Sequence, residues 1–510
     1  MTFEIVFVLL SLLGMVAALI ADKMRPGMIL FSVVVLFLCA GILTPKEMLE
    51  GFSNKGMITV ALLFLVSEGI RQSGTLGQVI KKLLPQGKTT VFKAQLRILP
   101  SVAFISAFLN NTPVVVIFAP IIKHWAKSVN LPATKFLIPL SYVTILGGIC
   151  TLIGTSTNLV VHGMILEAGF EGFSMFELGK VGIFIAIAGI IYIFLFSKRL
   201  LPDARPDTAV PDEEVEEGEK LHRVEAVLGA RFPGINKKLK DFNFQRHYGA
   251  EVKEIKTRNG QRFVSNLEEV VLHEGDTLVV MADDTFIPTW GESSVFVLLT
   301  NGNEPDTTGK KKKRWFALLL LVLMIVGATV GELPITKEMF PDIKLDMFFF
   351  VSITTIIMAW TNLFPARKYT KYISWDILIT IACAFAISKA MVNSGVADSV
   401  AKFIIGLSDD YGPHVLLAMV FIITNLFTEL ITNNAAAALA FPLALSISAQ
   451  LGVSPTPFFV VICMAASASF STPIGYQTNL IVQGIGNYKF TDFVRIGLPL
   501  NIITFLISII

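Results

Sequence analysis

The sequence predicts an all-α polytopic membrane protein made of two inverted repeats, with a small α+β domain inserted between them. Three observations predict this class. First, 53% of the 510 residues are hydrophobic and only 16% are charged, whereas a soluble protein carries roughly 25% charged residues. Second, many apolar runs approach the ~20 residues that cross a bilayer. Third, a polar motif inside such runs occurs twice, once in each half of the chain.

Six apolar segments follow one another in the first half. We expect membrane spans at 3–20, 28–44 and 57–70, a hairpin at 99–122, an interrupted span at 135–166 and a further span at 177–197. Before the hairpin, basic residues from Arg71 to Arg97 predict an amphipathic helix at the membrane surface. Because Pro113 prevents a continuous helix at the polar tip, we expect a re-entrant hairpin of two short helices.

The second half repeats this order of segments. Spans are expected at 315–332, 346–364 and 375–392, a second hairpin at 414–449, an interrupted span at 457–486 and a last span at 494–510. Each repeat therefore has five transmembrane helices and one re-entrant hairpin. Because five is odd, the two repeats must enter the membrane in opposite orientations, as in transporters with inverted repeats.

Between the membrane repeats, 1–199 and 314–510, the composition changes. Residues 200–220 form an acidic linker that includes Asp212 to Glu219, residues 221–290 alternate as short strands and turns, and residues 291–313 form a second linker. We expect the acidic linker to decouple the insert mechanically from the membrane part. We also expect the insert to dimerise, since an isolated small sheet is marginally stable.

Basic residues gather in the loops on one side of the predicted membrane part, whereas the opposite loops hold acids such as Glu171 and Asp409. The positive-inside rule makes the basic side cytoplasmic. The insert is then cytoplasmic and both termini lie outside, in a cell (inner) membrane. The net charge of +3 gives no indication of a nucleic-acid partner, and the four cysteines stand singly in apolar runs, as packing residues do.

The repeated motif places polar residues at the hairpin tips and in the interrupted spans, where helix ends and unwound backbone lie at membrane depth. Neutral oxygens of this kind suit a hard monovalent cation such as Na+. We expect one Na+ site in each repeat. The predicted ligands are Ser106, Asn111, Gly154 and Asn158 in the first site, and Thr428, Asn433, Gly475 and Asn479 in the second.

The other polar residues of the motif are predicted to bind the substrate, and they are Asn110, Thr112, Thr157, Thr432, Asn434 and Thr478. No arginine accompanies them, so a bound anion would be neutralised by helix N-termini and by the cations. The alternative is that these side chains only cap broken helices. Glu429 is interpreted as orienting the second tip, with proton transfer as the alternative. Glu68 and Lys389 either pair across the repeats or extend toward the interface.

These motifs resemble those of the divalent anion/sodium symporters, solute carrier family 13. That family carries Ser-Asn-Thr at both tips, and here the central residues Asn111 and Asn433 are kept while their neighbours differ. The interrupted span GTSTNLV is similar to that of the sulfate-type members. The resemblance implies a homodimer that works as an elevator. The insert, with HEGDTLVVMADD, resembles an RCK_C (TrkA_C) domain of potassium-channel regulators, which implies a small-molecule ligand.

We therefore expect Na+-coupled symport of a divalent anion, with sulfate preferred over a C4-dicarboxylate. The alternative is a cation/proton antiporter or metalloid-anion exporter on the same fold. An antiporter should carry buried Asp residues at the interrupted spans, and the sequence has none there. A channel gated by the insert is a third possibility. No nucleophile–base pair accompanies the polar tips, so an enzyme is not expected.

Overall fold

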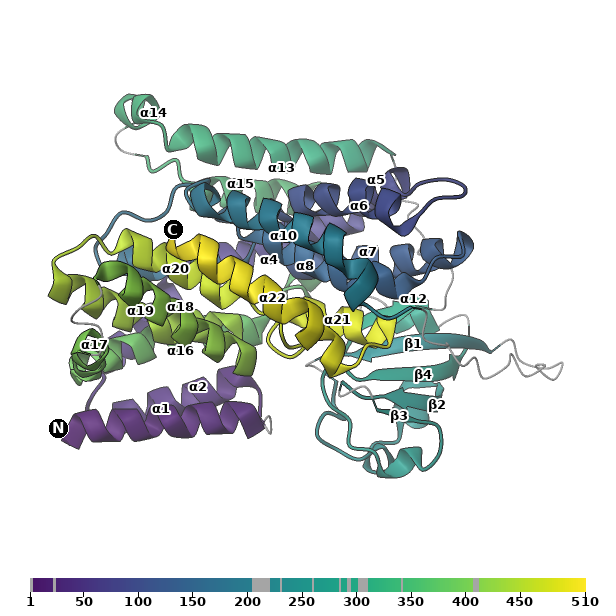
Figure 1. Ribbon diagram of the computed structural model, residues 1–510, viewed down its shortest axis with the longest axis horizontal. Coiled ribbons are helices and arrows are strands. Elements are labelled where there is room, and N and C mark those ends of the chain that lie inside the picture. Colours follow the sequence, from purple (N-terminus) through teal and green to yellow (C-terminus); the bar gives the residue numbers. More distant parts are fainter. Residues whose placement is uncertain are drawn as a thin grey trace.

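Helices make up the membrane part, and all strands lie together at one end of the molecule (Figure 1). The computed structural model describes residues 3–21, 24–203, 221–229, 232–258, 261–283, 286–290, 295–300, 311–340, 343–406 and 412–510. Within these residues, 8 helices are long and apolar enough to cross a membrane. The predicted class, a helical polytopic membrane protein with a small sheet in a central segment, is confirmed.

Among its described residues, the first repeat contains ten α-helices before the insert. They are α1 (Phe3–Ala21), α2 (Pro26–Cys39), α3 (Pro45–Glu50), α4 (Lys55–Gln72), α5 (Thr75–Leu83), α6 (Val91–Ser106), α7 (Asn111–Ser128), α8 (Leu137–Gly148), α9 (Ser156–Glu167) and α10 (Gly179–Leu200). α6 and α7 form the first hairpin. α8 and α9 are the two halves of the interrupted span, and the residues between them are not helical.

In the described residues of the second repeat, the order of helices matches the first repeat from the fourth helix on, whereas the six-residue helix is second here and third in the first repeat. They are α13 (Lys311–Gly331), α14 (Pro334–Met339), α15 (Met347–Trp360), α16 (Trp375–Asn393), α17 (Val396–Gly406), α18 (Pro413–Leu430), α19 (Asn433–Leu451), α20 (Thr456–Ser467), α21 (Gln477–Gly486) and α22 (Phe490–Ile509). Matching turns support the repeat. Gly74 and Gly395 both adopt a positive φ, 71° and 74°, between α4 and α5 and between α16 and α17.

The hairpin arms are longer than the sequence predicts. α6 begins at Val91 rather than near residue 99, because the Thr90 hydroxyl accepts a hydrogen bond from the backbone N–H of Lys93 and caps the helix. Arg97 therefore lies in the hairpin arm, and the surface helix is only α5. In the second hairpin, α18 and α19 are each long and apolar enough to cross a membrane. That the second hairpin enters and leaves the membrane on one side stays a prediction.

The insert contains a five-stranded sheet in the order β3-β2-β4-β1-β5, in which all neighbours are antiparallel. The strands are β1 (His222–Leu228), β2 (Glu251–Lys256), β3 (Arg262–Phe263), β4 (Thr277–Ala282) and β5 (Phe296–Thr300), with the short helices α11 (Phe244–Tyr248) and α12 (Phe286–Trp290). β5 lies in the range 291–313 predicted as a linker. The insert therefore continues to Thr300, because β5 pairs with the second edge of β1.

The sheet of the insert lies against the membrane helices. Along β1, Val224 and Ala226 belong to the core of the insert, whereas Val227 belongs to the core of the membrane part. On the same face as Val227, the Glu225 carboxylate accepts a hydrogen bond of 3.0 Å from Lys123 of α7. The predicted mechanical decoupling is therefore wrong, because this face is covered by the same chain. The acidic stretch 212–219, on which that prediction depended, lies outside the described residues.

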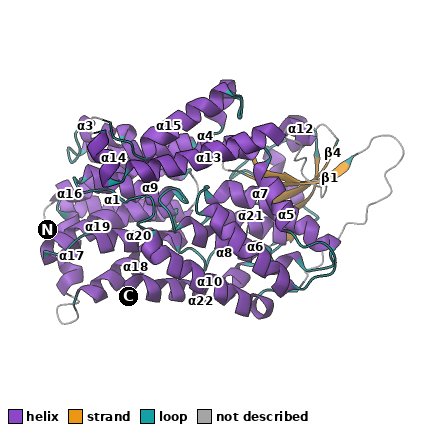
Figure 2. Cartoon of the chain, turned by 90° about the horizontal axis from the view of Figure 1, so that it is seen from above, coloured by secondary structure: helices purple, strands orange, loops and turns teal. Residues whose placement is uncertain are grey.

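Both chain ends lie toward the end of the helix bundle that is away from the sheet (Figure 1), and the view from above agrees (Figure 2). The insert and the termini thus lie toward opposite ends of the helix bundle. Which of these ends is cytoplasmic stays a prediction from the basic loops.

Candidate functional site

Four helices begin where the two repeats meet. α7 and α19 begin at Asn111 and Asn433, and α9 and α21 begin at Ser156 and Gln477. None of the four residues that precede them makes a side-chain capping hydrogen bond, and these residues are Asn110, Thr432, Thr155 and Tyr476. The N–H groups at these four helix starts therefore lack the usual side-chain acceptor, so they are suited to an anion.

Each hairpin tip faces the interrupted span of the other repeat. The Asn434 Oδ1 atom accepts hydrogen bonds from Ser156 Oγ at 3.3 Å and Thr157 Oγ1 at 3.2 Å. In the reciprocal contact, Thr112 Oγ1 donates to Gln477 Oε1 at 3.3 Å. The structure thus brings the predicted substrate residues of both repeats together. Sequence reasoning gave their identity within each repeat but not this crossed pairing.

The remaining predicted substrate residues have different surroundings. Thr432 Oγ1 is buried and has no hydrogen-bond partner in the described part of the chain, so it is available to a ligand. Thr478 Oγ1 instead accepts a hydrogen bond of 2.9 Å from Ser141 of α8. Asn110 lines a cavity together with Ser67, Ser156 and apolar side chains.

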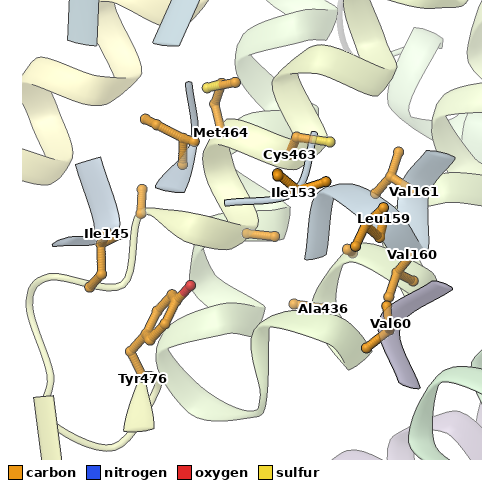
Figure 3. Close-up of a cluster of buried hydrophobic side chains, with 14 of the residues drawn as sticks. Val60, Ile145, Ile153, Leu159, Val160, Val161, Ala436, Cys463, Met464 and Tyr476 are labelled. Atoms are coloured by element: carbon orange, nitrogen blue, oxygen red, sulfur yellow. The ribbon is translucent and has the colours of Figure 1, made fainter. Parts of the chain in front are cut away.

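Tyr476 lies at the centre of this region, and sequence reasoning missed it. Its hydroxyl is 2.6 Å from the Asn111 amide and 2.9 Å from Thr155 Oγ1, and Asn433 is a further hydrogen-bond partner. Apolar side chains of both repeats lie around it, among them Ile145, Ile153 and Ala436 (Figure 3). The available signal was its position, since Tyr476 follows Gly475 as Thr155 follows Gly154.

The non-helical segment between α8 and α9 is the first break. Asn158 holds this break in place and leaves one oxygen free. Its Nδ2 atom donates to the carbonyls of Gly148 at 3.3 Å and Thr151 at 2.8 Å. Its Oδ1 atom is fully buried and has no hydrogen-bond partner among the described residues. A buried amide oxygen without a donor is costly. A cation beside it would remove that cost.

The Asn111 amide points into a group of oxygens. In one orientation its Oδ1 atom accepts from Ser106 Oγ at 2.9 Å, and the same position lies 3.2 Å from the Gly154 carbonyl and 3.1 Å from the Thr144 carbonyl. Three of the four predicted ligands of the first site, Ser106, Asn111 and Gly154, are therefore adjacent. Thr144 is an additional carbonyl that the sequence did not indicate, because it precedes the break by a full turn of α8.

The second break, between α20 and α21, has the same hydrogen bonds from an asparagine amide to its own carbonyls, but here the amide oxygen also accepts a hydrogen bond. Asn479 Nδ2 donates to the carbonyls of Ser469 at 2.8 Å and Thr472 at 3.3 Å, as Asn158 does at the first break. Its Oδ1 atom, however, accepts from Ser141 Oγ at 2.7 Å. Thr428 Oγ1 donates to the Ala466 carbonyl at 2.6 Å. The two predicted cation sites are thus alike in backbone and different in free oxygens.

Close packing explains the glycines of the two breaks. A Cβ atom on Gly475 would lie 2.0 Å from Ser469 Oγ and 2.3 Å from the Thr428 carbonyl oxygen. A Cβ atom on Gly154 would lie 2.4 Å from the Gly148 carbonyl oxygen. Each glycine therefore lets its own backbone approach a second segment of the same repeat.

Glu429 binds the second break through hydrogen bonds. Its carboxylate accepts from the backbone N–H groups of Ser471 at 2.9 Å and Thr472 at 3.0 Å, and from Asn501 Nδ2 at 2.8 Å. This arrangement favours the positioning interpretation over proton transfer. Glu68 pairs with Arg71 on its own helix at 2.7 Å, so its proposed pairing with Lys389 is not what the structure contains.

Within the described residues, no group of three or more His, Cys, Asp or Glu side chains is placed to hold a metal ion. Helices broken at equivalent places in two repeats, with their ends gathered around buried polar side chains, define a secondary transporter. The citrate transporter (CitMHS) family model matches residues 16–452 and 343–510. The chain belongs to this family, and the resemblance to the divalent anion/sodium symporters is confirmed.

Several relatives cover nearly the whole chain. An uncharacterized transporter of Synechocystis sp. is 30% identical over 92% of this chain and 90% of its own length. A putative sulfur deprivation response regulator of Chlamydomonas reinhardtii is 28% identical over 94% of this chain and 96% of its own length. Probable sodium/sulfate cotransporter 3 of the same alga is 22% identical over 94% of this chain and 85% of its own length.

Proposed function

We propose that this protein is a Na+-coupled symporter of a divalent anion. The observation that carries the proposal is the meeting of four helix N-termini without side-chain caps, at α7, α9, α19 and α21. Each helix N-terminus is equivalent to roughly +0.5 elementary charge, so four together supply about +2, which matches a divalent anion. The printed name of a relative, probable sodium/sulfate cotransporter 3, supports the same substrate class.

Sodium is the proposed coupling ion. The unpartnered Oδ1 atom of Asn158 and the oxygens around Asn111 favour a cation held by neutral ligands at the first break. Gly475 and Asn479 would contribute to a second site at the second break, together with Thr428 and Asn433. Bound Na+ adds positive charge next to the helix ends, so cation and anion each strengthen the binding of the other.

Sulfate is the preferred anion in this proposal, ahead of a C4-dicarboxylate. The first break presents three hydroxyls in a row, Thr155, Ser156 and Thr157, and hydroxyl donors suit a compact tetrahedral oxyanion. The alternative cation/proton antiporter lacks support, because Glu429, a half-buried carboxylate beside the second break, already accepts hydrogen bonds from four donors.

We further propose that the protein is a homodimer in the inner membrane, with the basic loops and the insert in the cytoplasm. Transport would follow an elevator mechanism, in which the hairpins and interrupted spans move as one body. The insert is proposed to regulate transport as an RCK_C-like ligand-binding domain. The insert contacts α7, and this helix begins at the site, so a change in the insert could act on ligand binding through α7.

Uptake of labelled sulfate into proteoliposomes tests the proposal. We expect uptake to require a Na+ gradient and to be reduced by unlabelled sulfate more than by succinate or citrate. Strong competition by succinate with none by sulfate would refute the substrate preference. Uptake that is equal with Na+ and with K+ would refute the coupling ion.

A further inference from the structure

The Tyr476 hydroxyl touches both repeats, and a hydroxyl both donates and accepts a hydrogen bond. It lies 2.6 Å from the Asn111 amide of the proposed first Na+ site. On its other side it lies 2.9 Å from Thr155 Oγ1, at one of the helix starts proposed to hold the anion. The phenol therefore stands between the proposed cation site and the proposed anion site.

The Asn111 amide fits this position in two orientations with opposite consequences. With Oδ1 toward the Gly154 and Thr144 carbonyls, at 3.2 and 3.1 Å, oxygens face oxygens and no proton lies between them. A cation among them would make this orientation favourable. With the amide turned over, its nitrogen donates to both carbonyls and to Ser106 Oγ, and no cation is needed.

Each orientation requires a different role of Tyr476. When Oδ1 faces the carbonyls, Asn111 Nδ2 donates to the Tyr476 oxygen, and the phenol proton is free for another acceptor. When the amide is turned over, its oxygen accepts the phenol proton at 2.6 Å, and that proton is no longer available. The proton stays on Tyr476 in both states, and only the direction of the hydrogen bond changes.

We propose that Tyr476 is a positioning residue that couples Na+ binding at the first site to anion binding, through reversal of its hydrogen bond with Asn111. Na+ fixes the amide oxygen toward the carbonyls, and the freed phenol proton then becomes a donor for the anion. The inference rests on the proposed symport function and adds the atoms that link the two ligands.

The proposed coupling acts through Asn111 of the first site, and Asn433 of the predicted second site is a further hydrogen-bond partner of the same hydroxyl. The equivalent residue in the first repeat, Thr155, has a short side chain whose hydroxyl is paired with Tyr476 itself. At the second break, the Asn479 amide oxygen already accepts a hydrogen bond from Ser141, so the amide oxygen that is free at the first break is engaged at the second. We therefore expect anion affinity to follow occupancy of the first Na+ site.

Tyr476→Phe tests the proposal, with Tyr142→Phe as the matched control. Tyr142 is another buried tyrosine, and its hydroxyl donates at 2.5 Å to the backbone carbonyl of Phe470 rather than to a site residue. Isothermal titration of the purified full-length protein would measure Na+ affinity, and sulfate and succinate affinity at low and high Na+. In Tyr476→Phe we expect Na+ binding to persist and the Na+-induced gain in anion affinity to fall by about tenfold or more.

Three results would overturn the proposal. The first is a Tyr476→Phe protein with the wild-type gain in anion affinity. The second is an equal loss of that gain in Tyr142→Phe, because this would indicate a general packing effect. The third is a wild-type protein whose anion affinity does not depend on Na+, which would refute the proposed symport function itself. The wild-type titration thus separates failure of the function from failure of the coupling.

A spectroscopic measurement keeps the proposal testable if Tyr476→Phe does not fold. The intensity ratio of the tyrosine Fermi-doublet Raman bands rises when a phenol changes from a hydrogen-bond donor to an acceptor. We expect a rise in this ratio when Na+ replaces K+ in the wild-type protein without anion. An unchanged or lower ratio would overturn the reversal of the hydrogen bond.

Discussion

Replacement of Asn158 by alanine should weaken Na+ binding at the first break. The substitution removes a buried amide oxygen that has no donor among the described residues. A contact to a charged group contributes about 1.5–3 kcal/mol, so the half-saturating Na+ concentration should rise roughly 10- to 150-fold. The same substitution leaves the Gly148 and Thr151 carbonyls unpaired, which costs about 1–3 kcal/mol each in folding stability.

The two effects separate in thermal unfolding measured across a Na+ series, with K+ keeping the ionic strength constant. A ligand that binds only the folded state stabilises it by about 2.7 kcal/mol at 100 times its dissociation constant. Wild-type protein should therefore gain stability along the series. Asn158→Ala should start from a lower Tm and gain stability only at higher Na+ concentrations.

Asn425→Ala is a matched control for this experiment. Asn425 Nδ2 also donates to two backbone carbonyls beside a break, those of Ala465 at 3.4 Å and Ala468 at 2.7 Å, but it is not a predicted ligand. We expect this variant to lose Tm while keeping the wild-type Na+ dependence at the first site. An Asn158→Ala protein whose half-saturating Na+ concentration matches wild type would refute the assignment of Asn158 as a ligand.

Two further predictions concern the insert and the second break. Burial raises the pKa of the Glu225 carboxyl, but Lys123, Lys256 and Arg223 outweigh it and lower the pKa to about 2. Because this pKa lies below its ordinary value of 4.5, the stability that Glu225 contributes is present at neutral pH and is lost as the pH falls from about 4.5 toward 2. Lys123→Gln should weaken docking of the insert by about 1–3 kcal/mol and raise the pH at which β1 and β5 lose protection in hydrogen exchange. Lys127→Gln, at an exposed position of the same helix, should do neither. Equal protection in both variants would contradict the role of the ion pair. Gly475→Ala places a Cβ atom 2.3 Å from the Thr428 carbonyl oxygen and should cost about 1–3 kcal/mol or more, measured as a lower Tm. Gly14→Ala, which has open space around its Cβ inside α1, should not lower the Tm, because alanine favours a helix interior. A wild-type Tm in Gly475→Ala would show that the break can relax.

The sequence by itself determined the membrane class, the two repeats and the polar breaks. Apolar runs and basic loops follow from the cost of placing charge and unpaired backbone in lipid, so they are visible without coordinates. The positions of Asn158 and Asn479 could be predicted because each amide binds carbonyls of its own break, which are only 7 and 10 residues away in sequence. Contacts between residues that are close in sequence can therefore be recognised from the sequence.

Only the tertiary structure decided which residues of one repeat meet those of the other. The contacts of Asn434 with Thr157 and of Tyr476 with Asn111 join segments from the two halves of the chain, and no spacing in sequence encodes them. The docking of the insert was missed for the same reason. A charged residue such as Glu225 on a strand suggests a solvent-facing side chain, and its burial is favourable because Lys256 of the insert and the distant Lys123 both pair with it.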